Sequence, residues 1–198
     1  DEVWSSSPGA DRLRCGLLDR RAPPAGAAVA RLDQIVPGRI ADLPCNVRNS
    51  QTALVLHALG AAGVVASVEL DFSGVLALAG RLPAACAVIA VVGGFVPVMT
   101  TFQDHGGPAR LRAEVSEGGL AYRLDPQDHG GTVIREARVL CAPDAALALR
   151  GRVDGLLLDL GAEETEATAA QVAAWRALLD GRLDAEGLRR AARAWGEG

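Results

Sequence analysis

The chain has 198 residues, of which 49% are hydrophobic, so it can bury one substantial core and is not a disordered or fibrous protein. Its formal net charge of −4 disfavours a dedicated nucleic-acid-binding protein, because such proteins need a basic face to displace counterions. All 20 basic residues are arginine, which excludes Schiff-base catalysis and P-loop phosphate binding, since both need a lysine amine.

The cysteines are widely spaced and show no pattern typical of a zinc or iron–sulfur site. Three of them lie beside apolar runs, where a free thiol packs as a small hydrophobic side chain. We therefore expect buried, reduced thiols and a cytoplasmic protein. No apolar run reaches the roughly 18 residues of a membrane helix, and the acidic start is unlike a signal peptide, so no membrane association is expected. The cysteines are Cys15, Cys45, Cys86 and Cys141.

The first part of the chain, residues 1–38, contains SSSPG, RAPPAG and VPG, so turn residues repeatedly interrupt its apolar content. We predict an irregular N-terminal arm here, with one short helix or strand. The pattern becomes regular from residue 39, and residues 39–198 are expected to form one domain.

Apolar strands and helical patterns alternate in the first half of that domain. The run over 86–92 is apolar at every position, as expected for a strand buried on both faces. Side-chain caps for the helices are available at Asn49 or Ser50 and at Asp71 or Ser73. In chain order we predict a short apolar run over 39–44, a helix over about 49–60, a strand over 64–67, a helix from about 71 to 82, and the strand over 86–92.

The second half begins with a different pattern. Residues 109–141 read as a hairpin followed by another extended piece, which makes this segment a β-rich insertion. The helix–strand alternation then returns, with predicted helices over 145–149, 163–179 and 184–195 and a buried strand over 154–160. Such alternation predicts an α/β fold with a parallel sheet, whose chemistry gathers at the C-terminal ends of the strands.

The sequence QDHGG occurs twice, at 103–107 and 127–131. One interpretation is a metal site shared by the two Asp–His pairs, and another is a catalytic role for His105 by itself. The third is two independent polar turns, in which Asp bonds its own backbone and Gly supplies a positive φ. The geometry favours the turns, because adjacent side chains on extended backbone point to opposite sides. No metal site is therefore predicted.

The role of each polar residue at the predicted strand ends has two interpretations. Glu69 is a base or ligand-binding carboxylate, or else a cap for the helix that follows. Asn46 and Asn49 are hydrogen-bond donors to a ligand, or caps that close a loop. Asp159 reaches into the mouth of the fold, or caps the next helix. Ser67, His105 and Asp159 all lie at strand ends, but no nucleophile-elbow motif supports a serine protease.

Three stretches match, in order, the motifs of a known family. They are CNVRNSQTALVLHALGAAGVVASVEL at 45–70, VIAVVGGFVPVMTT at 88–101 and DGLLLDLGAE at 154–163. They carry an N-x-x-N pair before a helix, a strand ending in S-x-E-L, a G-x-x-P-x-M segment and a final Leu-rich strand with an acid. Over about 45–180 the chain resembles the later half of the U32 peptidase family, the collagenase-like barrel proteins.

This resemblance implies a (β/α) barrel of the TIM type, complete or partial, with the β-rich insertion around 109–141. A complete barrel takes about 250 residues, so the sheet here is expected to have an open edge. We expect a second copy, a paralogous subunit or the N-terminal arm to cover that edge. The expected catalytic residues are Glu69, His105 and Asp159, and the expected substrate contacts are Asn46, Asn49, Ser67, Gly94 and Met99.

Family members have been labelled proteases, and others take part in hydroxylation of RNA bases or of the ubiquinone ring. Several hold an iron–sulfur cluster through cysteines after the strand that here ends at Gly94. This chain has VPVMTTFQDHGG in that place, without a cysteine, so no cluster and no other cofactor is predicted. Phe95 also stands where an arginine is common, which removes one contact to an anionic substrate.

Two functions are therefore expected. The first is a hydrolase or hydroxylation-related protein without the cluster, and the alternative is a non-catalytic scaffold or partner subunit of a fuller paralogue. An enzyme should bring its polar residues together in one pocket. A scaffold subunit should have a filled, apolar mouth and a large apolar patch elsewhere.

Overall fold

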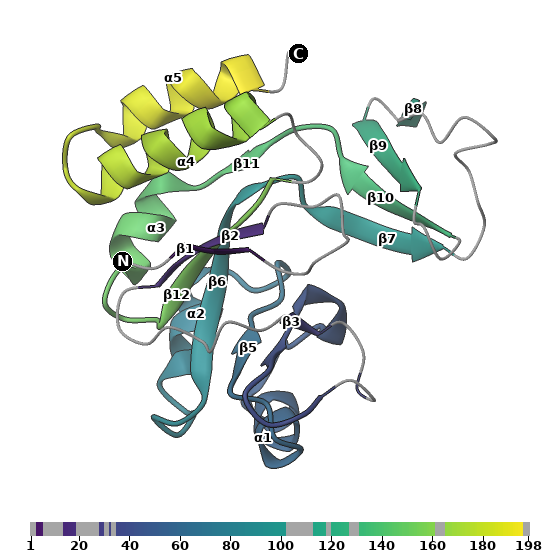
Figure 1. Ribbon diagram of the computed structural model, residues 1–198, viewed down its shortest axis with the longest axis vertical. Coiled ribbons are helices and arrows are strands. Elements are labelled where there is room, and N and C mark those ends of the chain that lie inside the picture. Colours follow the sequence, from purple (N-terminus) through teal and green to yellow (C-terminus); the bar gives the residue numbers. More distant parts are fainter. Residues whose placement is uncertain are drawn as a thin grey trace.

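The structure is a computed structural model that describes residues 3–5, 14–18, 28–29, 32, 35–101, 113–117, 120–126, 131–160 and 165–195. These residues form two sheets and five α-helices (Figure 1). Figure 1 shows α3, α4 and α5 stacked at one end of the molecule, α1 and α2 towards the other, and the smaller sheet projecting to the side. The helices are α1 Ser50–Ala58, α2 Phe72–Ala79, α3 Pro143–Leu149, α4 Thr165–Leu179 and α5 Ala185–Trp195.

The larger sheet has the spatial order β1, β2, β12, β6, β5, β4, β3, and β11 pairs with the end of β6. Neighbouring strands from β3 to β12 are parallel, which confirms the predicted α/β fold with a parallel sheet. The strands are β1 Val3–Ser5, β2 Arg14–Leu18, β3 Ala28–Val29, β4 Ile40–Ala41, β5 Gly63–Val65, β6 Ala87–Gly94, β11 Leu140–Cys141 and β12 Gly155–Asp159.

The N-terminal arm contributes three short strands, where the sequence had suggested one short element. β2 pairs with β12 in the antiparallel direction, and β1 continues the sheet beyond β2. The arm therefore lies along the outer edge of β12. It is one of the three elements that we expected to cover an open edge of the parallel sheet. β3 extends the opposite side of the sheet next to β4.

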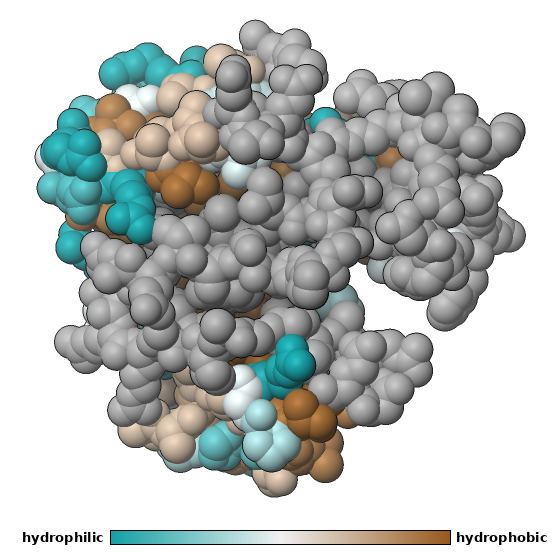
Figure 2. Space-filling model, viewed as in Figure 1, coloured by the Kyte–Doolittle hydropathy of each residue, from teal (hydrophilic) through white to brown (hydrophobic). Residues whose placement is uncertain are grey.

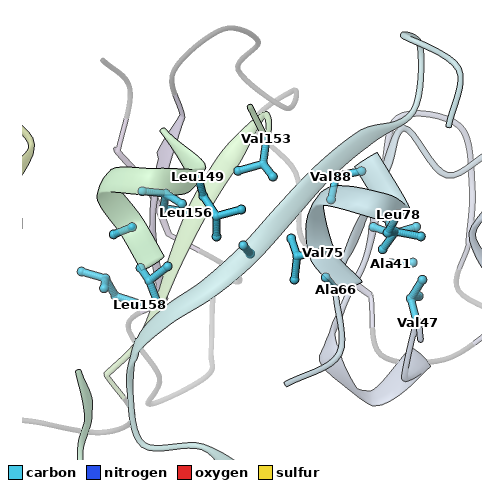
Figure 3. Close-up of a cluster of buried hydrophobic side chains, with 14 of the residues drawn as sticks. Ala41, Val47, Ala66, Val75, Leu78, Val88, Leu149, Val153, Leu156 and Leu158 are labelled. Atoms are coloured by element: carbon cyan, nitrogen blue, oxygen red, sulfur yellow. The ribbon is translucent and has the colours of Figure 1, made fainter. Parts of the chain in front are cut away.

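Two buried clusters lie on opposite faces of the larger sheet, because successive side chains of a strand alternate between faces. The first cluster contains Val88 and Leu158 of the sheet together with side chains of all five α-helices, among them Leu78 and Leu149 (Figure 3). The second cluster contains strand residues and the short 3-10 helix Leu43–Cys45, with no residue of the five α-helices. The described helices therefore pack on one face of the sheet.

The close packing of α4 on the sheet depends on a glycine. Gly93, near the end of β6, lies under Trp175 of α4, and a Cβ atom at this glycine would lie 2.7 Å from the indole ring. Trp175 is itself 1% exposed. The absence of a side chain at Gly93 thus leaves room for the Trp175 indole against the strand.

The smaller sheet is antiparallel with the order β7, β10, β9, β8. β8 and β9 form the hairpin predicted for the insertion, and β10 corresponds to its further extended piece. β7 was not predicted as a strand; it continues from the end of β6 and pairs with β10, which follows about 30 residues later. The bounds are β7 Pro97–Thr101, β8 Ala113–Glu117, β9 Leu120–Pro126 and β10 Thr132–Glu136.

Candidate functional site

A pocket of about 1110 Å³ lies beyond the C-terminal ends of β5 and β6. This is the edge at which parallel α/β sheets bind their ligands. Its walls come from the residues after β5, the link from β6 to β7, the segment from β10 to β11, and the last turns of α5. The lining includes Val68, Val98 and Leu140 as aliphatic side chains and Glu69, Glu136, Arg138, Arg189 and Arg193 as charged ones.

Glu69 is the expected catalytic acid that the structure places in this pocket. Its backbone N–H donates to the buried Ser67 Oγ over 3.2 Å, and the Ser67 N–H donates to the Val47 carbonyl over 3.0 Å. Ser67 thus has a structural role in holding the turn that presents Glu69. The Glu69 carboxylate lies 2.9 Å from Arg48, and because both side chains are about half exposed the pair is worth at most about 1 kcal/mol. A ligand group could therefore replace Arg48 at little cost.

The two expected asparagines have different positions. Asn46 ends the short 3-10 helix in the left-handed region, at φ 45°, and its Nδ2 lies 3.5 Å from Glu69 Oε1. It therefore lies beside the Glu69–Arg48 pair. Asn49 caps α1, since its Oδ1 accepts from the Thr52 N–H over 2.9 Å. Glu69 is not a helix cap, because α2 is capped by Asp71, which accepts from the Gly74 N–H over 2.7 Å.

Asp159, at the end of β12, is 1% exposed and pairs with Arg135 of β10 over 3.0 Å. Arg135 also donates to the Phe95 carbonyl, and the Phe95 N–H donates to the Asp159 carbonyl over 2.7 Å. The guanidinium carbon of Arg123 lies 4.1 Å above the Phe95 ring. This group joins the smaller sheet to the end of the larger one. Asp159 is therefore part of a buried structural junction and does not line the pocket.

Gly94 and Met99, both expected to contact substrate, are not among the pocket residues either. Gly94 is buried with φ 107°, and a Cβ atom there would lie 2.0 Å from the Asp159 carbonyl oxygen. Packing against Asp159 therefore requires a glycine at this position. Met99 lies on β7 and is 59% exposed, opposite Ile134 of β10.

The third expected catalytic residue, His105, lies outside the described residues, together with the rest of the first QDHGG copy. The second copy connects β9 to β10, two antiparallel neighbours, and only its last residue is described. That residue, Gly131, has φ 90°, which is the conformation predicted for a turn glycine.

Burial raises the pKa of each thiol in the described part of the chain, namely Cys45, Cys86 and Cys141. All three are free thiols; Cys86 is buried, and the other two are partly buried. Within the described ranges, no group of three His, Cys, Asp or Glu side chains is arranged to hold a metal ion. The helices of those ranges include none that is long and apolar enough to cross a bilayer.

Sequence reasoning missed the arginines around this edge of the sheet. Arg135 and Arg138 lie three residues apart at the end of the insertion, and Arg189 and Arg193 lie one helical turn apart on α5. The spacing on α5 was the available signal, since residues four apart share a helix face.

No protein-family profile, no curated protein and no solved structure matches the chain. The site must therefore be interpreted from its own residues.

Proposed function

We propose that the protein is a U32-like chain that binds a small molecule in the pocket beside Glu69, without performing peptide hydrolysis there. The observation that carries this proposal is the position of Glu69, which the Ser67 turn presents at the rim of a pocket of about 1110 Å³. This volume is slightly above the roughly 300–1,000 Å³ of typical small-molecule sites, and the lining combines aliphatic side chains with charged groups, as such sites do.

Binding is preferred to catalysis because the expected catalytic set is divided between two places. Glu69 lines the pocket, whereas Asp159 faces Arg135 in the buried junction. Ser67 is 5% exposed, and its hydroxyl already accepts a backbone hydrogen bond. A nucleophile and its base must lie within hydrogen-bond reach of each other, and these residues serve other contacts.

The barrel form of the fold belongs to the same proposal. The described helices pack on one face of the larger sheet, which is the arrangement of a (β/α) barrel with its helices outside. Ile40, Val65, Ile89 and Leu157 would then face the interior, as a layer of branched side chains from adjacent parallel strands. The β-rich insertion extends from the end of β6, beside the pocket at the mouth.

Filling the pocket tests this proposal. In a ¹H–¹⁵N NMR screen of fragments against the full chain, we expect bound fragments to shift amides around Val68, Val98 and Leu140. Val68→Trp should weaken these fragments by at least about tenfold, because the indole would occupy the pocket. Leu147→Trp is the control, since Leu147 is an exposed aliphatic residue of α3 outside the pocket lining. Fragments that bind equally well to Val68→Trp would refute the proposal.

A second candidate function, a subunit that associates with another copy of the chain, is favoured by an exposed apolar patch on α1. Val55 of α1 and Leu59, the C-cap residue directly after this helix, lie four residues apart and are 59% and 54% exposed. Val36, 47% exposed, lies nearby, because a Cβ atom at Gly60, the residue after Leu59, would lie 3.2 Å from the Pro37 N. Figure 2 shows hydrophobic atoms gathered over this end of the molecule.

Size measurement distinguishes the second function. If α1 associates with a second copy, light scattering after gel filtration should give a dimer mass at tens of micromolar chain, and Val55→Asp should restore the monomer. The dimer should be lost in this variant because burying a carboxylate without a partner opposes association. Leu147→Asp, at an exposed leucine of α3, is the control and should leave the dimer intact. A monomer at every concentration would eliminate this function.

A further inference from the structure

We propose that the ligand of the Glu69 pocket is an amphipathic anion, whose acid group is held by Arg138 and Arg193 and whose aliphatic part lies against the valine wall. This inference rests on the proposed function and specifies the chemical class of its ligand. It follows from the charge and the apolar surface of the pocket.

The charges of the pocket are not balanced by the residues around it. Glu69 is paired with Arg48, and Arg189 is paired with Asp144 and lies 3.6 Å from Glu186. Among the described residues, Arg138 and Arg193 have no carboxylate partner. Glu136 is the remaining acid of the lining, so the lining contains these two arginines and one further carboxylate.

The positions of these arginines indicate an anion site more strongly than their residue type does, because every basic residue of this chain is arginine. Arg138 enters from the segment after β10 and Arg193 from α5, so two unconnected elements bring positive charge to one pocket. Guanidinium groups bind carboxylates and phosphates through paired hydrogen bonds. An acid group between the two elements would have a guanidinium group available from each of them.

The apolar part of the pocket defines the rest of the ligand. Val68 and Val98 line it and remain 38% and 48% exposed. Val96, Val139 and Leu140 continue this wall. Covering these side chains with an aliphatic group would remove apolar surface from water, which is the main source of affinity in such sites. A fully hydrophilic anion would leave this wall exposed.

Four probes with the same octyl chain test the inference on the full chain: octanoate, octyl phosphate, octan-1-ol and octylamine. We expect octanoate or octyl phosphate to bind at least about tenfold more tightly than octan-1-ol, by the shifts of pocket amides in ¹H–¹⁵N NMR. Octylamine should bind most weakly. The difference between the two anions shows whether the site prefers a carboxylate or a phosphate.

Variants locate the acid group. Arg138→Gln and Arg193→Gln should each reduce the affinity for the anion by about tenfold, while the affinity for octan-1-ol stays the same. Arg190→Gln is the control, because this exposed arginine neighbours Arg189 on α5 but does not line the pocket. It removes the same charge and should have little effect.

The possible failures are distinct. Equal affinity for octanoate, octyl phosphate and octan-1-ol, with binding still lost in Val68→Trp, would overturn the anion and leave the proposed pocket function standing. An effect of Arg190→Gln as large as that of Arg193→Gln would also overturn it, since net charge alone would then explain the preference. Absence of binding by all four probes would overturn both the inference and the proposed function.

Discussion

Gly94→Ala is expected to prevent folding or to lower the free energy of unfolding by more than about 4 kcal/mol. Gly94 has φ 107°, which an L-residue adopts only with strain. The added Cβ would also lie 2.0 Å from the Asp159 carbonyl oxygen and 2.7 Å from the Asp159 N. Both contacts are with backbone of the adjacent strand, so β6 and β12 would have to separate at their C-terminal ends.

Gly181→Ala is the matched control for this change. Gly181 also has a positive φ, of 74°, but a Cβ there meets nothing within 4 Å. It should therefore lose only the conformational contribution, about 1–2 kcal/mol. Urea unfolding followed by circular dichroism gives both values. A difference of less than about 1 kcal/mol between the two losses in free energy of unfolding would contradict the close approach of Gly94 to Asp159.

Arg135→Met is expected to lower the free energy of unfolding by about 3–5 kcal/mol, because it removes the guanidinium group that faces a buried carboxylate. Arg135 and Asp159 side chains are 2% and 1% exposed, so water cannot replace the lost partner. The Phe95 carbonyl would lose its donor in the same variant. Urea unfolding of the full chain measures the change.

A double variant separates the ion pair from the packing of the arginine stem. Arg135→Met with Asp159→Leu should be less destabilised than the sum of the two single changes, because no buried charge is left behind. Arg138→Met, an identical substitution three residues later at an exposed position, should change stability by less than about 0.5 kcal/mol. Additive effects of the two single variants would contradict the ion pair.

Helices and strands of the domain were predictable where a few consecutive residues specify them. The predicted helix over 163–179 is α4 Thr165–Leu179, and the continuous apolar run over 154–160 contains β12 Gly155–Asp159. Asn49 and Asp71 both cap helices, as the sequence allowed. These features depend on local periodicity and on side-chain hydrogen bonds to nearby backbone groups.

The site was predictable only in part. Glu69 follows a strand, so its place at the C-terminal edge of the sheet could be inferred, and it lines the pocket. Asp159 also lies at a strand end, as the last residue of β12, yet it pairs with Arg135. Nothing near Asp159 in the sequence indicates its partner, because that arginine lies 24 residues earlier in the chain and belongs to the separate antiparallel sheet. The partner of a buried charge depends on which strand pairs with which.

The sequence by itself determined the class of the fold, the caps and the apolar strands, because each of these is encoded within a few neighbouring residues. Only the tertiary structure decided that β2 lies along β12, that β7 pairs with β10, and that arginines of α5 and of the insertion face the same pocket as Glu69. Those outcomes depend on contacts between segments far apart in the chain, and such contacts leave no periodic signal in the residues that make them.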